Sequence, residues 1–161
     1  LDPARADAWY NLGQVFLAGG NPTEGERSLR KAIDADPNLL GARYRLAVLL
    51  LGTQRGDQAV PLLEEAIRIA PDDAKFLFLL ATVYDDLGRT AEARDGYLKA
   101  RGAGSTNPRL GLYLAQTQVQ LKQTAEARGE LDALLKAPAT DPQVRKQAED
   151  LLRSLGNEQT R

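Results

Sequence analysis

The side chains most able to do chemistry in this sequence are carboxylates, because the chain contains no histidine and no cysteine. Histidine is the commonest general base and metal ligand, and cysteine supplies thiol nucleophiles and zinc thiolates. The adjacent carboxylates Asp85 and Asp86 fall on a predicted helix, where neighbouring side chains diverge by about 100°. They would not converge on one metal ion or one substrate atom. The sequence therefore predicts a protein that is not an enzyme, with no catalytic residue, no metal site and no cofactor.

Aromatic and basic side chains suit binding better than catalysis. Tyr10, Tyr44 and Phe78 stand 34 residues apart, and Arg45 and Lys75 lie close to them in the sequence. Aromatic residues and arginine dominate the energetics of binding surfaces. Whether these side chains share one surface depends on the elements that carry them.

The whole sequence repeats at the same interval of 34 residues. Asp36-Pro37-Asn38 returns as Ala70-Pro71-Asp72. Self-similarity at such a period is typical of solenoids. Two columns of small residues keep this register through four repeats: Gly13, Ala47, Ala81 and Ala115, and Gly25, Ala59, Ala93 and Ala127.

Each repeat contains two segments with apolar residues at helical spacing. In the first repeat the helices are predicted over residues 6–18 and 22–35, with Asn21 as the N-cap and Pro22 in the first turn of the second. Asn107-Pro108 is predicted to start the first helix of the fourth repeat. The predicted caps of the other second helices are Asp57, Thr90 and Thr124.

Gly13 lies within a predicted helix, where glycine costs about 1 kcal/mol relative to alanine. Two antiparallel helices approach closely only where a side chain is very small. Burial of Trp9, Leu12 or Phe16 around such a contact is worth roughly 1.5–3 kcal/mol per side chain and can offset the cost. The small columns therefore predict all-α helix pairs that pack closely.

At these residues the chain resembles the tetratricopeptide repeat family. Trp9, Leu12, Gly13 and Phe16 match its W-x2-L-G-x2-Y element, with phenylalanine for tyrosine. The resemblance covers four repeats, 6–39, 40–73, 74–107 and 108–141, followed by a capping helix over 142–155. It implies a single domain over residues 1–161, built as a right-handed α-solenoid of antiparallel helix pairs with about nine helices. Residues 1–5 are expected to be the tail of a preceding repeat, and Gly156-Asn157 the stop of the last helix.

The resemblance also implies a concave groove, lined by the first helix of each repeat, that binds a peptide or helix of a partner protein. The groove-facing side chains of successive first helices form rungs about 10 Å apart. They would contact every third residue of an extended peptide or every seventh residue of a helix, and both binding modes stay open. The expected peptide-binding residues are Tyr10, Gln14, Tyr44, Arg45, Val48, Lys75, Phe78, Thr82, Asp85, Arg109, Leu112 and Gln116.

Arg45, Lys75 and Arg109 lie near helix starts, where backbone N–H groups also favour anions. One hypothesis is that they form a basic edge that prefers a carboxylate-bearing peptide, opposite an acidic patch at Asp85 and Asp86. The alternative is that all these charges are simply solvated. The carboxylate clamp of chaperone-binding family members is not expected, because only Lys75 matches its pattern.

The composition bounds the remaining function classes. The formal net charge is −1, with 43% hydrophobic and 27% charged residues, so neither nucleic-acid binding nor membrane insertion is expected. The leading interpretation is a non-catalytic protein-interaction scaffold. The alternatives are self-assembly through an exposed N-terminal face, giving a homo-oligomer, and recruitment of substrate for a larger enzyme. The residues fit both the bacterial cytoplasm and the cell envelope and do not decide the compartment.

Overall fold

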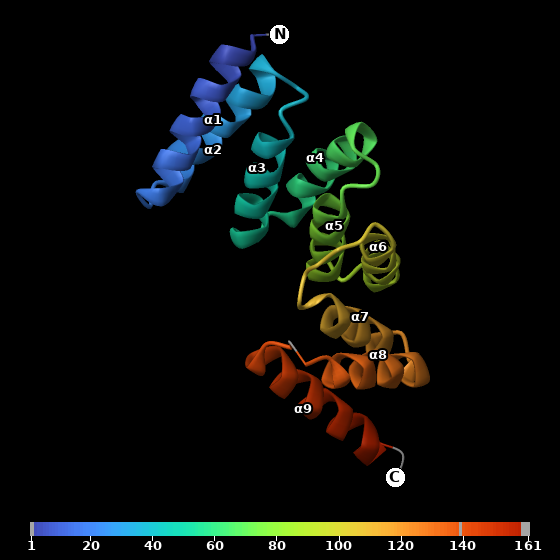
Figure 1. Ribbon diagram of the computed structural model, residues 1–161. Helices are drawn as coiled ribbons and strands as arrows, with labels where there is room; N and C mark the ends of the chain where they lie inside the picture. The colour runs from blue at the N-terminus through green and yellow to red at the C-terminus, as the bar shows by residue number, and fades with distance from the viewer. Residues whose placement is uncertain (1, 139, 159–161) are drawn as a thin grey trace.

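The computed structural model describes residues 2–138 and 140–158. Over these residues the chain forms nine α-helices and no strand, which confirms the predicted all-α class. Consecutive helices pair, and α9 follows the fourth pair (Figure 1). The helices are α1 (Pro3–Ala18), α2 (Pro22–Ala35), α3 (Leu40–Gly52), α4 (Gly56–Ile69), α5 (Ala74–Asp86), α6 (Thr90–Gly102), α7 (Leu110–Gln120), α8 (Thr124–Lys136) and α9 (Pro142–Glu158).

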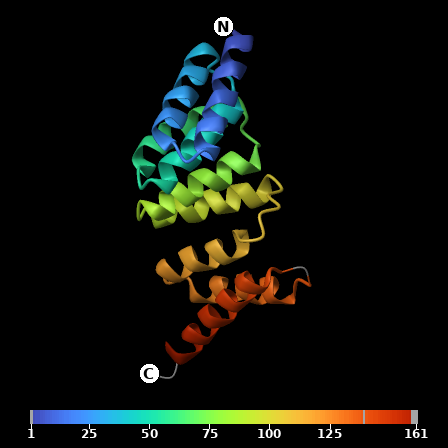
Figure 2. The ribbon, with the colours of Figure 1, turned by 90° about the vertical axis from the view of Figure 1, so that its left-hand side faces the viewer.

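The pairs are stacked in chain order, so that α1 and α9 lie at opposite ends of the molecule (Figures 1 and 2). Each helix packs against the helix before it and the helix after it. The prediction of a solenoid is therefore confirmed, because the helices do not gather around one common centre.

The small residues of the first pair lie where α1 and α2 approach each other. A methyl group on Gly13 would come within 3.0 Å of Leu29 Cγ and 3.3 Å of the carbonyl oxygen of Gly25. A methyl group on Gly25 would lie 2.5 Å from Leu17 Cδ2. Carbon atoms pack at about 3.5–4.0 Å, so only glycine fits at Gly25 without movement of Leu17. The alanines of the two columns in the later pairs are all fully buried, as the size argument predicted.

The predicted helix caps are correct at Asn21 and wrong at three other positions. Asn21 Oδ1 accepts a hydrogen bond from the backbone N–H of Glu24. Asp57, Thr90 and Thr124 instead lie inside their helices, because α4, α6 and α8 begin at or before them. Arginine or glutamine occupies each of these N-cap positions without a capping side-chain bond. Thr90 Oγ1 donates instead to Gln120 Oε1 of α7, at 2.9 Å.

Three helix boundaries also differ from the sequence prediction. Pro3 begins α1, so the first helix starts three residues before the predicted residue 6; residue 1 lies outside the described residues. Helix α7 begins at Leu110, two residues after Pro108, because residues 107–109 form a turn in which Asn107 Oδ1 accepts from Arg109 N–H. Helix α9 does not stop at Gly156 and runs on to Glu158.

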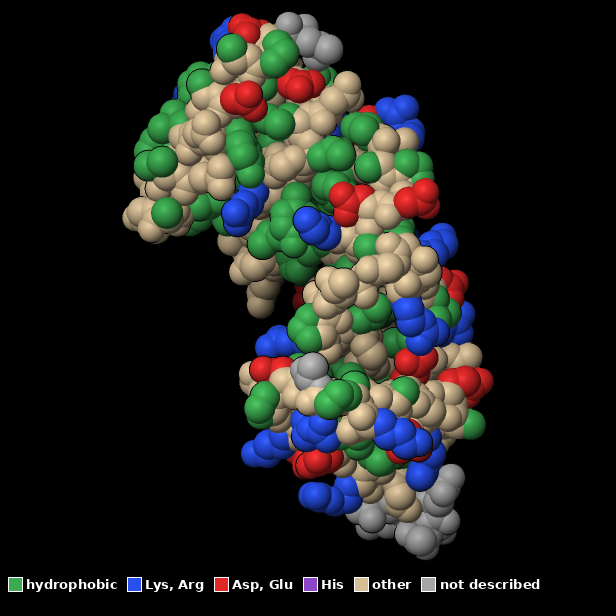
Figure 3. All heavy atoms as spheres, in the orientation of Figure 1, with side chains coloured by type: hydrophobic (Ala, Val, Ile, Leu, Met, Phe, Trp, Pro, Cys, Tyr) green, Lys and Arg blue, Asp and Glu red, His purple; other side chains and the backbone are tan. Residues whose placement is uncertain are grey.

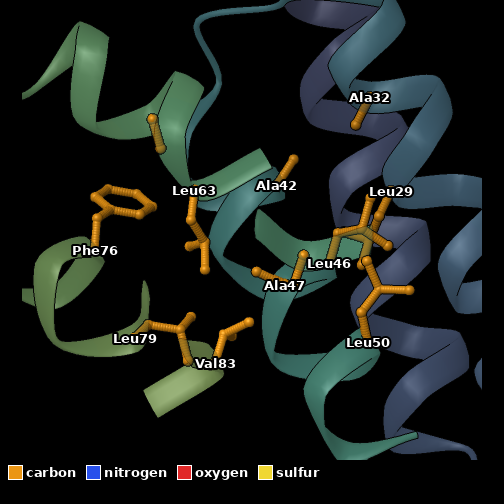
Figure 4. Packing of buried hydrophobic residues seen from close by; sticks show 12 residues of the cluster. Leu29, Ala32, Ala42, Leu46, Ala47, Leu50, Leu63, Phe76, Leu79 and Val83 are labelled. Atoms are coloured by element: carbon orange, nitrogen blue, oxygen red, sulfur yellow. The ribbon is translucent and has the colours of Figure 1, made fainter. Parts of the chain in front are cut away.

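The buried apolar side chains form three clusters along the stack. The first joins α2, α3, α4 and α5 and includes Leu29, Leu46 and Leu63 (Figure 4). The second joins α5, α6 and α7 around Tyr97. The third joins α7, α8 and α9 around Leu131. Helices α5 and α7 contribute to two clusters each and thereby connect them.

Charged side chains join second helices of successive repeats. Arg55 at the start of α4 donates to both carboxylate oxygens of Glu26 in α2, at 2.7 and 2.9 Å. These hydrogen bonds, together with that of Arg30, hold the pKa of Glu26 at about 2, although burial opposes the shift. Arg101 of α6 donates to Glu130 of α8 at 2.6 Å. Ion pairs thus bridge α2 to α4 and α6 to α8.

Candidate functional site: the concave face

Two neighbouring cavities lie along the first helices. The first has a volume of about 460 Å³, and the first helices α1, α3 and α5 line it with Tyr10, Tyr44 and Phe76. Arg45, Lys75 and Asp73 supply its charges. In the space-filling view, hydrophobic side chains lie beside basic ones over α3, at the edge of the hollow in the molecule (Figure 3).

The second cavity, of about 410 Å³, shares Tyr44, Asp73 and Lys75 with the first and adds Phe78. Residues 104–108, which connect α6 to α7, form its other wall. The two cavities therefore continue into each other along one surface, which we call the concave groove. It is lined by the residues of these two cavities.

Each aromatic rung of the groove also packs on the next first helix. Tyr10 lies over Gly41 of α3, where an added methyl group would be 3.4 Å from the ring of Tyr10. The rings of Tyr44 and Phe76 meet edge to face, with centroids 5.9 Å apart. Phe78 lies 5.9 Å from Tyr113 of α7. All three rungs are only half-buried, so each packs on one side and offers the other to the groove.

The charge of the groove is more basic than acidic. Arg45 and Lys75 are exposed, and neither makes an ion pair within the described part of the chain. Asp73 is the acidic residue among the linings, and its Oδ1 accepts from the backbone N–H of Lys75 at 2.9 Å as the N-cap of α5. Two cations over an aromatic floor favour a ligand that combines apolar side chains with a carboxylate.

The structure thus brings five of the twelve predicted residues into the linings of the two cavities: Tyr10, Tyr44, Arg45, Lys75 and Phe78. Gln14 and Gln116 are half-buried, Val48 is 40% exposed, and Arg109 is exposed as the N-cap of α7. These four residues lie outside both linings.

Leu112 does not line the groove, and its prediction was wrong. Only 1% of its surface is exposed, because it is buried with Val144 and Ala148 of α9 in the third cluster. The ladder of exposed rungs therefore ends at Phe78. Beyond that rung, the turn at residues 104–108 forms the wall instead.

Thr82 and Asp85 lie outside the linings of both cavities. Thr82 Oγ1 donates to the carbonyl of Phe78 and lies 3.4 Å from the hydroxyl of Tyr97. Burial raises the pKa of the Asp85 carboxyl, and the neighbouring charge of Asp86 adds to this shift.

Sequence reasoning missed Phe76, Asp73 and the turn at residues 104–108. Asp73 could have been found as the cap before α5, since it stands directly before the apolar run. The role of the turn has no sequence signal, because it depends on where α7 sits relative to α5.

Two further kinds of site concern the described residues, namely metal sites and membrane-spanning helices. No group of three or more acidic side chains comes together there in a way that could hold a metal ion. No described helix has both the length and the apolar character that a membrane crossing requires.

The family model described as "Tetratricopeptide repeat" matches residues 1–39 and 44–108. The chain belongs to the tetratricopeptide repeat family. The paired helices, the small columns and the superhelical stack are therefore those of a tetratricopeptide repeat domain, a class that generally serves in protein interaction.

Known proteins and structures agree with this fold. Human protein O-mannosyl-transferase TMTC3 is 33% identical over 78 residues, which is 48% of this chain and 8% of that protein. The structure titled "Functional Characterization of Pseudomonas Aeruginosa pilF" matches with a TM-score of 0.78 at 25% identity, over 96% of this chain and 70% of that one. MamA from Desulfovibrio magneticus matches with a TM-score of 0.75 at 21% identity, over 81% and 74%. The tetratricopeptide repeat chain thus spans less than a tenth of its curated relative.

Proposed function

We propose that this tetratricopeptide repeat domain is a non-catalytic scaffold that binds a segment of a partner protein in the concave groove. The observation that supports the proposal best is the continuity of the two cavities, which share Tyr44 and Lys75. The partner segment places apolar side chains on the half-buried rungs. A carboxylate of the same segment lies against Arg45 and Lys75, so charge complementarity selects acidic over basic segments.

The test uses two fluorescein-labelled peptides that differ in backbone form. One is extended, with leucine at every third residue and aspartate between, to match rungs about 10 Å apart. The other is a stapled helix with leucine at every seventh residue and aspartate beside it. Fluorescence anisotropy is expected to show binding of one of them, and a version with lysine for aspartate should bind at least about tenfold more weakly.

Charge reversal locates the binding surface. The double variant Arg45→Glu with Lys75→Glu is expected to abolish the preference for aspartate, because both residues are exposed and the fold does not depend on them. The matched control reverses Lys136 and Lys146, which are equally exposed on α8 and α9. Equal effects of both pairs on peptide affinity would show that net charge alone, rather than the concave groove, decides binding.

Self-assembly through α1 is a second candidate, supported by exposed apolar residues at the N-terminal end. Leu12 is 38% exposed, whereas Leu46 and Leu114, which occupy the same place in later repeats, are fully buried. Val15 is 67% exposed. Sedimentation velocity at increasing concentration tests this candidate, and a monomer at high concentration would refute it.

A further inference from the structure

A second opening lies on the side of α5 that faces away from the concave groove. Leu77, Leu80 and Tyr84 follow one another along α5 and, with Ile67 of α4, form an apolar floor of a cavity of about 370 Å³ between α4 and α6. At Leu77 and Lys99 this cavity meets another, of about 460 Å³, beside Pro71 and Gly102. We call the continuous opening formed by these two cavities the α4–α6 furrow.

One pair of positions explains why the furrow is open. Each second helix contributes one residue that faces a residue of the next second helix. Between α6 and α8, this pair is Arg101 and Glu130, which are joined at 2.6 Å. The residues 34 positions earlier are Ile67 and Gly96. Both line the furrow. Where α6 and α8 are joined by an ion pair, α4 has an isoleucine and α6 has no side chain opposite it.

The space between α2 and α4 is closed in a different way. The residues a further 34 positions earlier are Ile33 and Leu62, and both side chains pack against the first apolar cluster. A leucine of α4 thus takes the place that is vacant at Gly96. A side chain cannot simply be added at Gly96, because its Cβ would lie 2.8 Å from Cβ of Ala81.

The floor is correspondingly more exposed than its counterparts. Leu80 is half-buried, whereas Leu46 and Leu114 at the same place in the neighbouring repeats are fully buried. No ion pair within the described residues joins α4 to α6, although ion pairs join α2 to α4 and α6 to α8. Between α4 and α6, the described residues thus lack the ion pair found on either side, and the apolar floor at Leu80 stays partly exposed.

Charges at the furrow define what fits. Glu92 and Asp95 on α6 are already paired, with Arg89 and Arg94. Glu64 on α4 accepts a hydrogen bond from the Tyr84 hydroxyl, at 3.2 Å, and makes no ion pair among the described residues. Lys99, where the two cavities meet, makes no ion pair among the described residues. An occupant gains most from a cation at Glu64 and an anion at Lys99.

We infer that the α4–α6 furrow docks an amphipathic helix of a partner protein, which inserts a leucine-sized side chain beside Gly96 and pairs its charges with Glu64 and Lys99. The leucine takes the role that Leu62 has between α2 and α4. This surface is separate from the concave groove, so the domain has two independent binding faces.

The test uses a fluorescein-labelled stapled helix that carries two leucines one turn apart, a lysine at one end and a glutamate at the other. Fluorescence anisotropy is expected to show binding to the whole chain, and Glu64→Lys and Lys99→Glu should each weaken it about tenfold. Replacement of the peptide's leucines by serine should abolish binding. The matched control is Asp132→Lys, because Asp132 occupies the place of Glu64 in the fourth repeat and is exposed; this variant should bind like the parent.

Three results would overturn the inference. The first is an absence of binding by the stapled helix. The second is an equal loss of affinity in Glu64→Lys and Asp132→Lys, and the third is competition by the peptide that binds the concave groove. Self-association of the chain that Glu64→Lys abolishes would identify a second copy, rather than a partner protein, as the occupant.

Discussion

The close approach of α5 and α6 at Gly96 gives a sharp test of the packing argument. This residue lies inside α6, and an added Cβ would be 2.8 Å from Cβ and 3.2 Å from Cα of Ala81 in α5. Carbon atoms pack at about 3.5–4.0 Å, so α5 and α6 must separate by roughly 1 Å to admit alanine. Ala81 is fully buried and has no rotatable side chain. The backbone must therefore move.

The magnitude follows from two opposing terms. Alanine gains about 1 kcal/mol over glycine in helix propensity. Forced overpacking costs about 1–3 kcal/mol, so Gly96→Ala is expected to lower the free energy of unfolding by up to about 2 kcal/mol. Gly129 in α8 is the matched control, since nothing beyond the adjacent backbone of its own helix lies within 4 Å of its added Cβ. Gly129→Ala should therefore stabilise the chain by up to about 1 kcal/mol.

Urea unfolding followed by far-ultraviolet circular dichroism compares the two variants with the parent. The urea midpoint should fall for Gly96→Ala and rise for Gly129→Ala, and the two free energies should differ by about 1–3 kcal/mol. A rise of the same size in both variants would refute the reasoning, because it would mean that α5 and α6 have room for a side chain at Gly96.

Three further predictions concern an ion pair, a cap and a core residue. The pKa of Glu26 is about 2, so its pairing with Arg55 stabilises the fold fully above the ordinary pKa of 4.5. This stabilisation is lost as the pH falls toward 2. Urea midpoints measured between these pH values should therefore fall less for Glu26→Gln than for the parent. Asp141→Ala removes the acceptor of two backbone N–H groups of α9 and should cost about 1 kcal/mol, with faster hydrogen exchange confined to the start of α9. Leu112→Ala should cost about 2–5 kcal/mol by thermal or urea unfolding, whereas Val15→Ala, at a residue 67% exposed, should change stability little.

The features that the sequence predicted well depend on side-chain size at a fixed period. The period of 34 residues is enough to predict that the small residues in the columns of Gly13 and Gly25 lie between paired helices. The half-buried rungs Tyr10, Tyr44 and Phe78, which line the two cavities, follow from the same period.

The features that escaped prediction depend on how whole helices approach one another. Leu112 follows the period but is buried, because α9 packs over it. Its burial cannot be deduced from the repeat itself. The repeat does not predict that Ile67 and Gly96 come together, because only the arrangement of α4 and α6 shows that the two positions line one opening.

The division of the apolar interior into three clusters also bears on how the chain loses its structure. Helix α8 and helix α9 take part only in the cluster at the C-terminal end. Contacts in such a stack reach only from one neighbour to the next, so melting need not proceed in a single step. Helices α8 and α9 can therefore open as a cooperative unit while the two clusters formed by α2 to α7 stay intact.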